Sequence, residues 1–448
     1  MRTPIYMTSM PVGPGLTALL ATAVLLLAGS AASLHAGEAA GAGNAHALAI
    51  TTDRPDHAYA VGEPVTWLVT LSGGQPGDPP PAPTYTVTAG TSAVASGTLR
   101  FVGGKASVSS RLDHPGILQL TVDLATPHRG EVRCGAAVAW SAITSTVPEA
   151  PDFDAFWKRK LTEVAAVPLS PALTEVDSGS PAVQLWTITL DGYRGSHIHG
   201  YLARPRGDAP LPAQLQVQYW GVYALRKSEV VGIAAKGWLA LDIMAHDLPG
   251  DQDDAFYKAA DASGRFSVNK GADDPETCYF LRMFLACSRA VDYLAGRRDW
   301  NAKTLLVQGG SQGGFQALAA AGLNSKVTAV TVFVPGGCDL AGSLQGRPDG
   351  WPQWLAYAQG AAREARIKTV AYYDAKNFAK RIHCPVLVGI GLLDTIASPL
   401  GQCAMFNNLT APKQLVIEPT EGHIGDHAAY KAVQQAWWKT AAAGGKLP

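Results

Sequence analysis

The segment Gly309-Gly310-Ser311-Gln312-Gly313-Gly314 lies between an apolar run, Thr304–Gln308, and a helical pattern that begins at Phe315. A serine at a sharp turn from strand to helix is typical of a nucleophile elbow, which lifts the serine Oγ above the edge of a sheet. The glycines around it leave room for the neighbouring elements to pass closely. The N-terminus of the helix also lends a partial positive charge to the turn. The segment therefore predicts that Ser311 is a nucleophile.

Apolar runs alternate with helical patterns on both sides of this turn, from about residue 150 onward. Continuous apolar runs separated by helices indicate a mostly parallel sheet that is covered on both faces. Two runs, Val183–Leu190 and Ser196–Arg204, flank Asp191–Gly195 and predict a hairpin. We therefore expect an α/β-hydrolase fold with a doubly wound, mostly parallel sheet. The other predicted strands are Leu215–Tyr219, Trp238–Met244, Thr304–Gln308, Val327–Val334, Val386–Gly391 and Gln414–Ile417, and helices are expected over Thr277–Leu294 and Phe315–Ala321.

An acid and a histidine should follow the serine in that order, because α/β-hydrolases arrange their catalytic triads in this way. Asp394 comes shortly after the apolar run Val386–Gly391, at the carboxyl end of a predicted strand. His423 lies on the loop after the last predicted strand, from which its ring can reach the serine. His427 is the alternative, four residues further on and within the next helical pattern. We predict the triad Ser311, Asp394 and His423.

The same chemistry needs an oxyanion hole made of two backbone N–H groups near the serine. One is expected from Gln312, the residue after the nucleophile, and the other from Val222, in the loop after Leu215–Tyr219. Trp220 in that loop and His246 on a later loop are expected to contact the substrate.

A different pattern occupies residues 47–146, where short alternating runs are broken by turn residues. This pattern predicts a small antiparallel β-sandwich of immunoglobulin-like type. It contains no catalytic constellation, so we expect a structural or positioning module. The Pro-rich segment Val147–Asp152 predicts a hinge, with the catalytic domain following at residues 150–448. The predicted sandwich strands are Val65–Leu71, Thr84–Val87, Gly97–Val102 and Gly116–Val122.

Residues 1–36 have the order of a secretory signal peptide. Leu16–Ala28 is almost wholly apolar, Arg2 is the only charge before it, and small residues follow it. The run is shorter than the roughly 20 residues that span a bilayer. An uncleaved membrane anchor is the alternative. We expect export to the periplasm or the cell exterior, with no membrane association after the signal is removed.

The composition excludes some partners. The 448 residues include 36 Lys+Arg and 36 Asp+Glu, and no dense Lys/Arg run occurs, so no nucleic-acid partner is expected. The six cysteines show neither CxxC nor metal-ligand spacing, which favours buried free thiols. His197 and His199 alternate on a predicted strand, but no third ligand stands out, so a solvated strand face is favoured over a metal pair. We predict neither a metal nor a cofactor.

Several motifs in the predicted catalytic domain are longer than a generic elbow: Asp152–Trp157, Asp274–Thr277, Arg289–Leu294, Gly309–Gly314, Asn377–Ile382, Gly391–Thr395 and Gly422-His423. They resemble the acetyl xylan esterase and cephalosporin C deacetylase type of α/β-hydrolase, carbohydrate esterase family seven. The resemblance runs from about Pro151 to the last residue, roughly two-thirds of the sequence. It implies the same triad, the same two oxyanion donors, an acetylated carbohydrate or small acetyl ester as substrate, and a homo-oligomer.

Two loops near the predicted site depart from that family. Trp220-Gly221-Val222 stands where the family has His-Gly-Tyr, and Met244-Ala245-His246-Asp247 replaces its Arg-Gly-Gln-Gly. The family's substrate preference and its hexameric assembly therefore carry over less directly than its chemistry. The β-sandwich is also additional to the simplest members.

The favoured function is an exported serine esterase that removes O-acetyl groups from acetyl xylan or acetylated oligosaccharides through an acyl-enzyme intermediate. A serine peptidase of prolyl-oligopeptidase type is the alternative, since it shares the fold and the order of the triad. About a hundred residues are too few for the β-propeller that usually precedes such a domain. A non-catalytic carbohydrate-binding protein on a degenerate hydrolase scaffold is a third alternative, and the intact triad weighs against it.

Overall fold

The computed structural model of the chain describes residues 47–73, 82–124 and 130–448. The predicted signal peptide at residues 1–36 lies outside this range. Within it, no helix combines the length and the apolar character that crossing a membrane requires. All six cysteines fall inside the described ranges, where none forms a disulfide and all but Cys384 are buried. The expectation of buried free thiols is thus confirmed for five of them.

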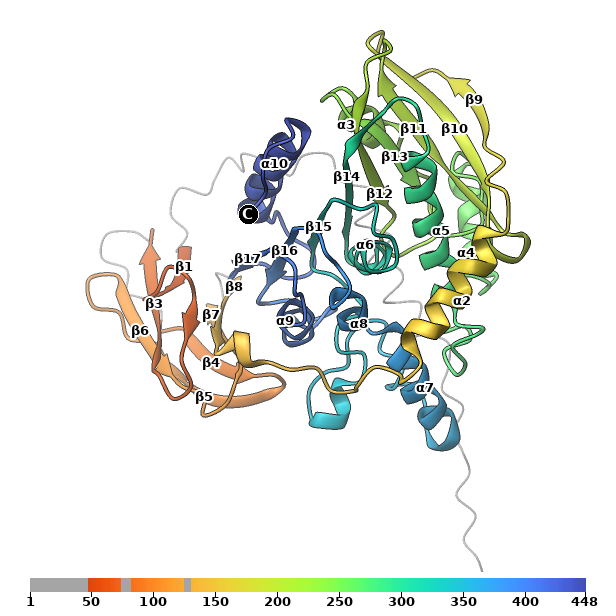
Figure 1. Cartoon of the computed structure of the whole chain (residues 1–448). Helices are drawn as coiled ribbons and strands as arrows, with labels where there is room; N and C mark the ends of the chain where they lie inside the picture. Colours follow the sequence, from red (N-terminus) through yellow and green to blue (C-terminus); the bar gives the residue numbers. More distant parts are fainter. Residues whose placement is uncertain (1–46, 74–81, 125–129) are drawn as a thin grey trace, which may run out of the picture. The chain divides into compact units, whose positions relative to one another are not determined.

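A nine-stranded sheet forms the centre of the second part of the chain, with the strand order β17-β16-β15-β14-β12-β13-β11-β10-β9 (Figure 1). The strands from β17 to β13 in that order pair in parallel, whereas β11, β10 and β9 add an antiparallel edge. The predicted mostly parallel sheet is confirmed. The strands are β9 (Ala172–Val176), β10 (Val183–Asp191), β11 (His197–Pro205), β12 (Leu211–Val217), β13 (Leu239–Ile243), β14 (Trp300–Gly310), β15 (Ala329–Phe333), β16 (Val386–Gly391) and β17 (Lys413–Glu418).

Helices cover both faces of this sheet, as Figure 1 shows. Alternate residues of a strand point to opposite faces, and β13 illustrates this: Leu239 and Leu241 join one apolar cluster, and Ala240 joins another. Helices α2, α5, α6, α7, α8 and α9 contribute to the first cluster, and α3, α4 and α10 to the second. The helices are α2 (Phe153–Ala165), α3 (Lys227–Ala234), α4 (Asp254–Ala262), α5 (Tyr279–Ala295), α6 (Gln312–Leu323), α7 (Gly360–Tyr373), α8 (Ala375–Ala379), α9 (Pro399–Asn407) and α10 (Ala428–Ala442).

The described residues between 47 and 138 form only β-strands and the turns and loops that join them. Two sheets, β1-β3-β6 and β2-β8-β7-β4-β5, share one apolar cluster whose members include Trp67 on β3 and Leu120 on β7, both fully buried. This arrangement is the expected β-sandwich. Its strands are β1 (Ala47–Thr52), β2 (Ala58–Tyr59), β3 (Val65–Ser72), β4 (Thr84–Ala89), β5 (Ser92–Thr98), β6 (Lys105–Ser110), β7 (Gly116–Leu124) and β8 (Gly130–Val138).

One predicted strand of the sandwich is wrong. The sequence pattern predicts a strand over Gly97–Val102, but β5 ends at Thr98, and Val102 makes only an isolated bridge to Lys105. Val102 instead belongs to the next turn, which Gly103 and Gly104 close with positive φ before Lys105.

Strands β7 and β8 also contact two loops of the nine-stranded sheet. The Gln119 side chain donates to the carbonyl of Leu392 at 2.6 Å, after β16, and the N–H of Gly135 donates to the carbonyl of Pro419 at 2.7 Å, after β17. A Cβ at Gly135 would lie 2.4 Å from the Cβ of Leu392, so glycine is required for this approach. These two loops carry the predicted triad acid and histidine. The division into domains at residues 47–146 and 150–448 stays a prediction.

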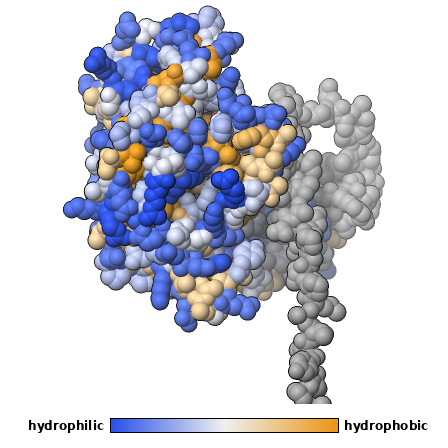
Figure 2. Space-filling view, turned by 90° about the vertical axis from the view of Figure 1, so that its right-hand side faces the viewer, coloured by the Kyte–Doolittle hydropathy of each residue, from blue (hydrophilic) through white to orange (hydrophobic). Residues whose placement is uncertain are grey.

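Polar residues predominate on the face of the molecule shown in Figure 2, and apolar residues gather there in small separate patches. Scattered apolar residues of this kind are ordinary for a protein surface.

Candidate active site

Ser311 occupies the turn between β14 and α6, where the sequence predicts a nucleophile elbow. Its backbone has φ 54° and ψ −122°, a conformation that costs a non-glycine residue about 1–3 kcal/mol. Hydrogen bonds from both sides fix this conformation, because the Ser311 N–H donates to Phe333 at 3.1 Å and the Ser311 carbonyl accepts from Gly336 at 2.9 Å.

Glycines make the turn sterically possible. A Cβ at Gly309 would lie 2.3 Å from the backbone of Gly313, and a Cβ at Gly313 would lie 2.6 Å from the carbonyl oxygen of Val217 on β12. Contacts below 3.0 Å are essentially never seen for real Cβ atoms, so both positions require glycine. The strand, the turn and the helix thus pack closely enough to present Ser311 at the carboxyl edge of the sheet.

The structure brings the three predicted triad residues together. His423 Nε2 lies 2.8 Å from Ser311 Oγ, and His423 Nδ1 lies 2.8 Å from Asp394 Oδ2. Since a carboxylate only accepts, Nδ1 carries the proton and Nε2 accepts from the serine hydroxyl. The His423 side chain is 12% exposed and that of Asp394 is fully buried. This geometry lets a histidine take the serine proton while a carboxylate balances the charge.

Asp394 is held by further hydrogen bonds. Its Oδ1 accepts from the N–H groups of Ile396 and Ala397, each at 2.8 Å, and its Oδ2 accepts from the Gln402 side chain at 3.2 Å. Because both oxygens are engaged, the carboxylate has one orientation, and that orientation aims Oδ2 at His423.

The alternative histidine, His427, lies elsewhere. It precedes α10 instead of lying within it, is 2% exposed, and pairs through Nδ1 with Glu418 at 2.6 Å. Burial is the largest single influence and acts to lower the pKa of His427, but the hydrogen bond and the charge of Glu418, together with the charge of Glu421 and a backbone hydrogen bond, leave the pKa above its ordinary value. This pair ties the start of α10 to the end of β17 and does not involve Ser311.

The loop that carries the predicted oxyanion donor Val222 is braced from inside the protein. Gln218, which is 4% exposed, donates to the carbonyl of Tyr223 at 2.9 Å and accepts from the N–H of Ala245 at 2.9 Å. Gly221 has φ 122°, which glycine alone adopts readily. These bonds fix the loop at both ends. The other predicted donor, Gln312, is the first residue of α6 and is fully buried.

His246 lies behind this loop, which differs from the predicted substrate contact. Its ring is 2% exposed, Nε2 donates to the carbonyl of Gly221 at 3.0 Å, and Nδ1 accepts from the hydroxyl of Tyr279. Burial lowers the pKa of His246 from its ordinary 6.5 to about 4, so the ring is neutral near pH 7. Trp220, in contrast, is 39% exposed and remains available to a ligand.

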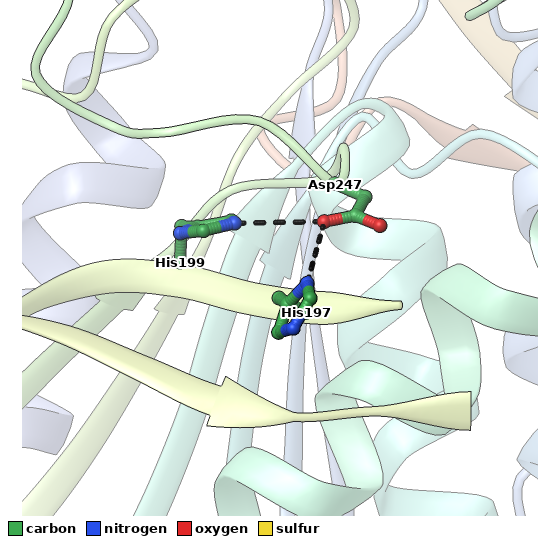
Figure 3. Close-up of side chains that lie close together, drawn as sticks. All are labelled: His197, His199 and Asp247. Atoms are coloured by element: carbon green, nitrogen blue, oxygen red, sulfur yellow. Dashed lines mark ion pairs between the residues drawn. The ribbon is translucent and has the colours of Figure 1, made fainter. Parts of the chain in front are cut away.

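The structure supplies a third group beside the histidine pair of β11. Asp247 Oδ1 lies 3.7 Å from His197 Nδ1 and 3.5 Å from His199 Nε2, as Figure 3 shows. The sequence pattern favours a solvated strand face because no third ligand stands out; the structure places a candidate third ligand, Asp247, beside the pair, from the loop after β13 and 48 residues beyond His199. The His197 side chain is 50% exposed, as a solvated face requires. One ligand atom from each of the two rings and the carboxylate lies within 4.8 Å of the other two.

The order of the strands and the turn after β14 define an α/β-hydrolase. Residues 142–442 match the family described as acetyl xylan esterase (AXE1). The chain belongs to this acetyl xylan esterase family and is a carboxylic ester hydrolase. This result favours the esterase over the peptidase and the non-catalytic alternatives.

Individual relatives agree with the family. The acetyl esterase Axe7A of Xylanibacter ruminicola is 32% identical over 338 residues, which cover 74% of this chain and 76% of that protein. The structure of an acetyl xylan esterase from Paenibacillus sp. R4 is similar with a TM-score of 0.59 and 26% identity, over 68% of this chain and 98% of that one. Acetyl xylan esterase 1 from Thermoanaerobacterium sp. JW/SL YS485 shares the fold with a TM-score of 0.56 at 23% identity, over 66% and 96% of the two chains.

Proposed function

We propose that the chain removes O-acetyl groups from carbohydrates through Ser311, His423 and Asp394. The observation that carries the proposal is the pair of 2.8 Å contacts that link Ser311 Oγ, the His423 ring and the Asp394 carboxylate. His423 accepts the proton of Ser311 as Oγ attacks the acetyl carbonyl carbon. The N–H groups of Gln312 and Val222 are the proposed donors to the oxyanion that forms.

The tetrahedral intermediate then collapses. The C–O bond to the sugar breaks, and His423 gives its proton to the departing sugar oxygen, which leaves the acetyl group on Ser311. A water molecule, deprotonated by His423, attacks the acetyl-enzyme, and acetate leaves with regeneration of the serine hydroxyl. Asp394 remains ionised throughout and stabilises the imidazolium that forms twice in the cycle.

Acetylated xylan and acetylated oligosaccharides are the substrates that the names of the relatives suggest. The esterases from Paenibacillus and Thermoanaerobacterium are named for acetyl xylan, and Axe7A is named an acetyl esterase. We also propose that the chain is exported, because the apolar segment Leu16–Ala28 is followed by small residues at which a signal peptidase can cut. Assembly into a homo-oligomer is part of the same proposal.

The test is a deacetylation screen with the wild-type chain and Ser311→Ala side by side. Acetate release is measured from acetylated xylan, acetylated xylo-oligosaccharides and p-nitrophenyl acetate, with a dipeptidyl anilide as the peptidase control. We expect acetate from the carbohydrates with wild type alone and no cleavage of the anilide. Hydrolysis of p-nitrophenyl acetate without acetate from any carbohydrate would overturn the substrate proposal while leaving the ester hydrolase intact.

Two further measurements address the acyl-enzyme and export. Rapid mixing with p-nitrophenyl acetate, followed by acid quench and mass spectrometry, should find one acetyl group on Ser311. The N-terminal sequence of the protein recovered from the periplasm or the medium should begin between residues 29 and 37. Retention of residues 1–36 on a membrane-bound product would favour the uncleaved anchor instead.

A further inference from the structure

The cluster of His197, His199 and Asp247 has no part in the proposed esterase chemistry. His197 and His199 are two residues apart on β11, so both rings project from the same face of the strand, with their centroids 6.0 Å apart. Asp247 approaches the pair from the loop after β13 (Figure 3). We propose that these three side chains bind one zinc ion.

The distances suit a single ion. Donor atoms bound to one tetrahedral zinc at about 2.0–2.2 Å lie about 3.4 Å from one another. Asp247 Oδ1 is 3.5 Å from His199 Nε2 and 3.7 Å from His197 Nδ1, so one oxygen already faces both rings at nearly this spacing. No two ligand atoms of the cluster are more than 4.8 Å apart. Small rotations of the side chains therefore complete the coordination.

The nitrogens that face away from Asp247 have partners of their own. His199 Nδ1 lies 3.3 Å from the hydroxyl of Thr189, and His197 Nε2 lies 3.9 Å from Asp191 Oδ1. Thr189 and Asp191 are the residues that pair directly with His199 and His197 across the antiparallel β10–β11 ladder. A hydrogen bond on the outer ring nitrogen, such as the one between Thr189 and His199, fixes the tautomer and leaves the inner nitrogen free to bind a metal. Asp191 is a charged neighbour of His197 without a hydrogen bond to it. Strand β11 thus supplies two ligands, the loop after β13 supplies the third, and β10 supplies the hydroxyl that orients His199.

Two imidazoles and one carboxylate are a donor set that suits zinc, which combines His and Asp ligands readily. The exposed fractions of the side chains are 50% for His197, 21% for His199 and 36% for Asp247, so an ion can enter from solvent and keep water in its remaining positions. The positive charge of Arg282 acts on Asp247 and opposes the binding of a cation at this cluster. Asp191 adds a second carboxylate on the other side and offsets it.

The site joins two segments that the oxyanion loop depends on. The carbonyl of His199 accepts from the N–H of Met244 at 2.8 Å, where the loop after β13 begins. Asp247 follows His246, whose ring holds the carbonyl of Gly221. A zinc ion would therefore strengthen the connection between β11 and the loop after β13, next to the hydrogen bond between His199 and Met244, and we expect it to stabilise the folded chain.

The test is zinc binding by the untagged full-length chain, measured by dialysis with elemental analysis and by titration calorimetry. We expect one zinc per wild-type chain and a rise in Tm with added zinc. His199→Gln and Asp247→Asn should each lose the bound zinc and the rise in Tm. Asp251→Asn, which removes the same charge from the same loop but no ligand, is the matched control and should bind zinc as wild type does.

Each outcome bears on the proposal. Equal zinc binding by Asp247→Asn and wild type, or no uptake by wild type at millimolar zinc, would overturn it. Uptake of nickel or copper but not of zinc would overturn the choice of metal. If the ligand variants fail to fold, Thr189→Val keeps all three ligands and should weaken zinc binding about 10–100-fold; unchanged affinity in that variant would also count against the site. None of these readouts depends on the esterase proposal.

Discussion

The Asp394→Asn variant separates a triad acid from a merely structural carboxylate. Asp394 Oδ1 accepts two backbone N–H bonds, from Ile396 and Ala397, so the amide oxygen of the asparagine must take that position. The amide NH₂ then occupies the place of Oδ2, which lies 2.8 Å from His423 Nδ1. A donor at this position forces Nδ1 to accept and moves the ring proton to Nε2. With a proton on Nε2, His423 can no longer take the proton of Ser311.

The expected loss is large. The same exchange in a well-studied serine triad lowers kcat about 10⁴-fold, which corresponds to about 5 kcal/mol of activation free energy. We expect a comparable loss of kcat/KM for p-nitrophenyl acetate, because the two backbone N–H bonds at Oδ1, each at 2.8 Å, outweigh the single 3.2 Å bond from Gln402 at Oδ2 and keep the amide oxygen at the Oδ1 position.

The control removes a different paired carboxylate. Asp299 binds Arg204 at 2.7 Å and Arg297 at 2.8 Å, and it immediately precedes β14, at the opposite end of the strand from Ser311. Asp299→Asn should lower the free energy of unfolding while kcat per folded molecule stays unchanged. If folded Asp394→Asn keeps a tenth of the wild-type kcat/KM, the assignment of the triad acid is wrong.

Three other predictions follow from the site. Ser311→Ala should lower kcat by several orders of magnitude, on the order of 10⁶, with an unchanged Tm, and a residual activity above one tenth in a contamination-free sample would contradict the nucleophile. Because the bulky Trp220 stands in the proposed oxyanion loop, where a longer acyl chain would meet it, p-nitrophenyl acetate should be hydrolysed at least about tenfold faster than the butyrate in kcat/KM, whereas a profile that rises toward octanoate would indicate a lipase-like site. The pKa of His246 is about 4 in the folded chain and 6.5 ordinarily, so the unfolded chain binds one more proton between these values. The free energy of unfolding of wild type, measured with urea, should therefore fall by up to about 1.4 kcal/mol per pH unit as the pH falls from 6.5 toward 4, in excess of any fall for His246→Gln. Parallel pH dependences of the two proteins would refute the buried neutral ring.

The catalytic half of the fold is predictable because its strands are continuous apolar runs. β16 matches the predicted Val386–Gly391 at both ends, since each of its residues is buried. The sandwich is predicted less completely: β1, β2, β6 and β8 have no predicted counterpart. β6 consists largely of small polar residues with only Val108 buried, and β8 includes the small residues Gly135 and Ala136, so neither shows a clear alternation of apolar and polar residues.

The predicted triad residues are close together in the structure because the elbow, the acid and the histidine each follow a strand whose carboxyl end lies at the same edge of the sheet. No sequence pattern of this kind predicts that Asp247 lies beside His197 and His199. Their proximity arises from the antiparallel pairing of β11 with β13, which starts the loop beside His199. The position of His246 behind the oxyanion loop could not be predicted from the sequence either, because its contact with Gly221 joins two loops whose shapes no local pattern encodes.

The close packing around the elbow limits which missense mutations the gene can tolerate there. A single base change in the first or second position of a glycine codon either introduces a stop or yields an amino acid with a Cβ atom, and at Gly309 and Gly313 such an atom would meet backbone at 2.3 and 2.6 Å. Backbone cannot rotate away as a side chain can, so no missense change at either codon is neutral. A mutagenesis library for new ester substrates should hold both codons fixed and place its diversity at exposed loop positions such as Tyr219 and Trp220.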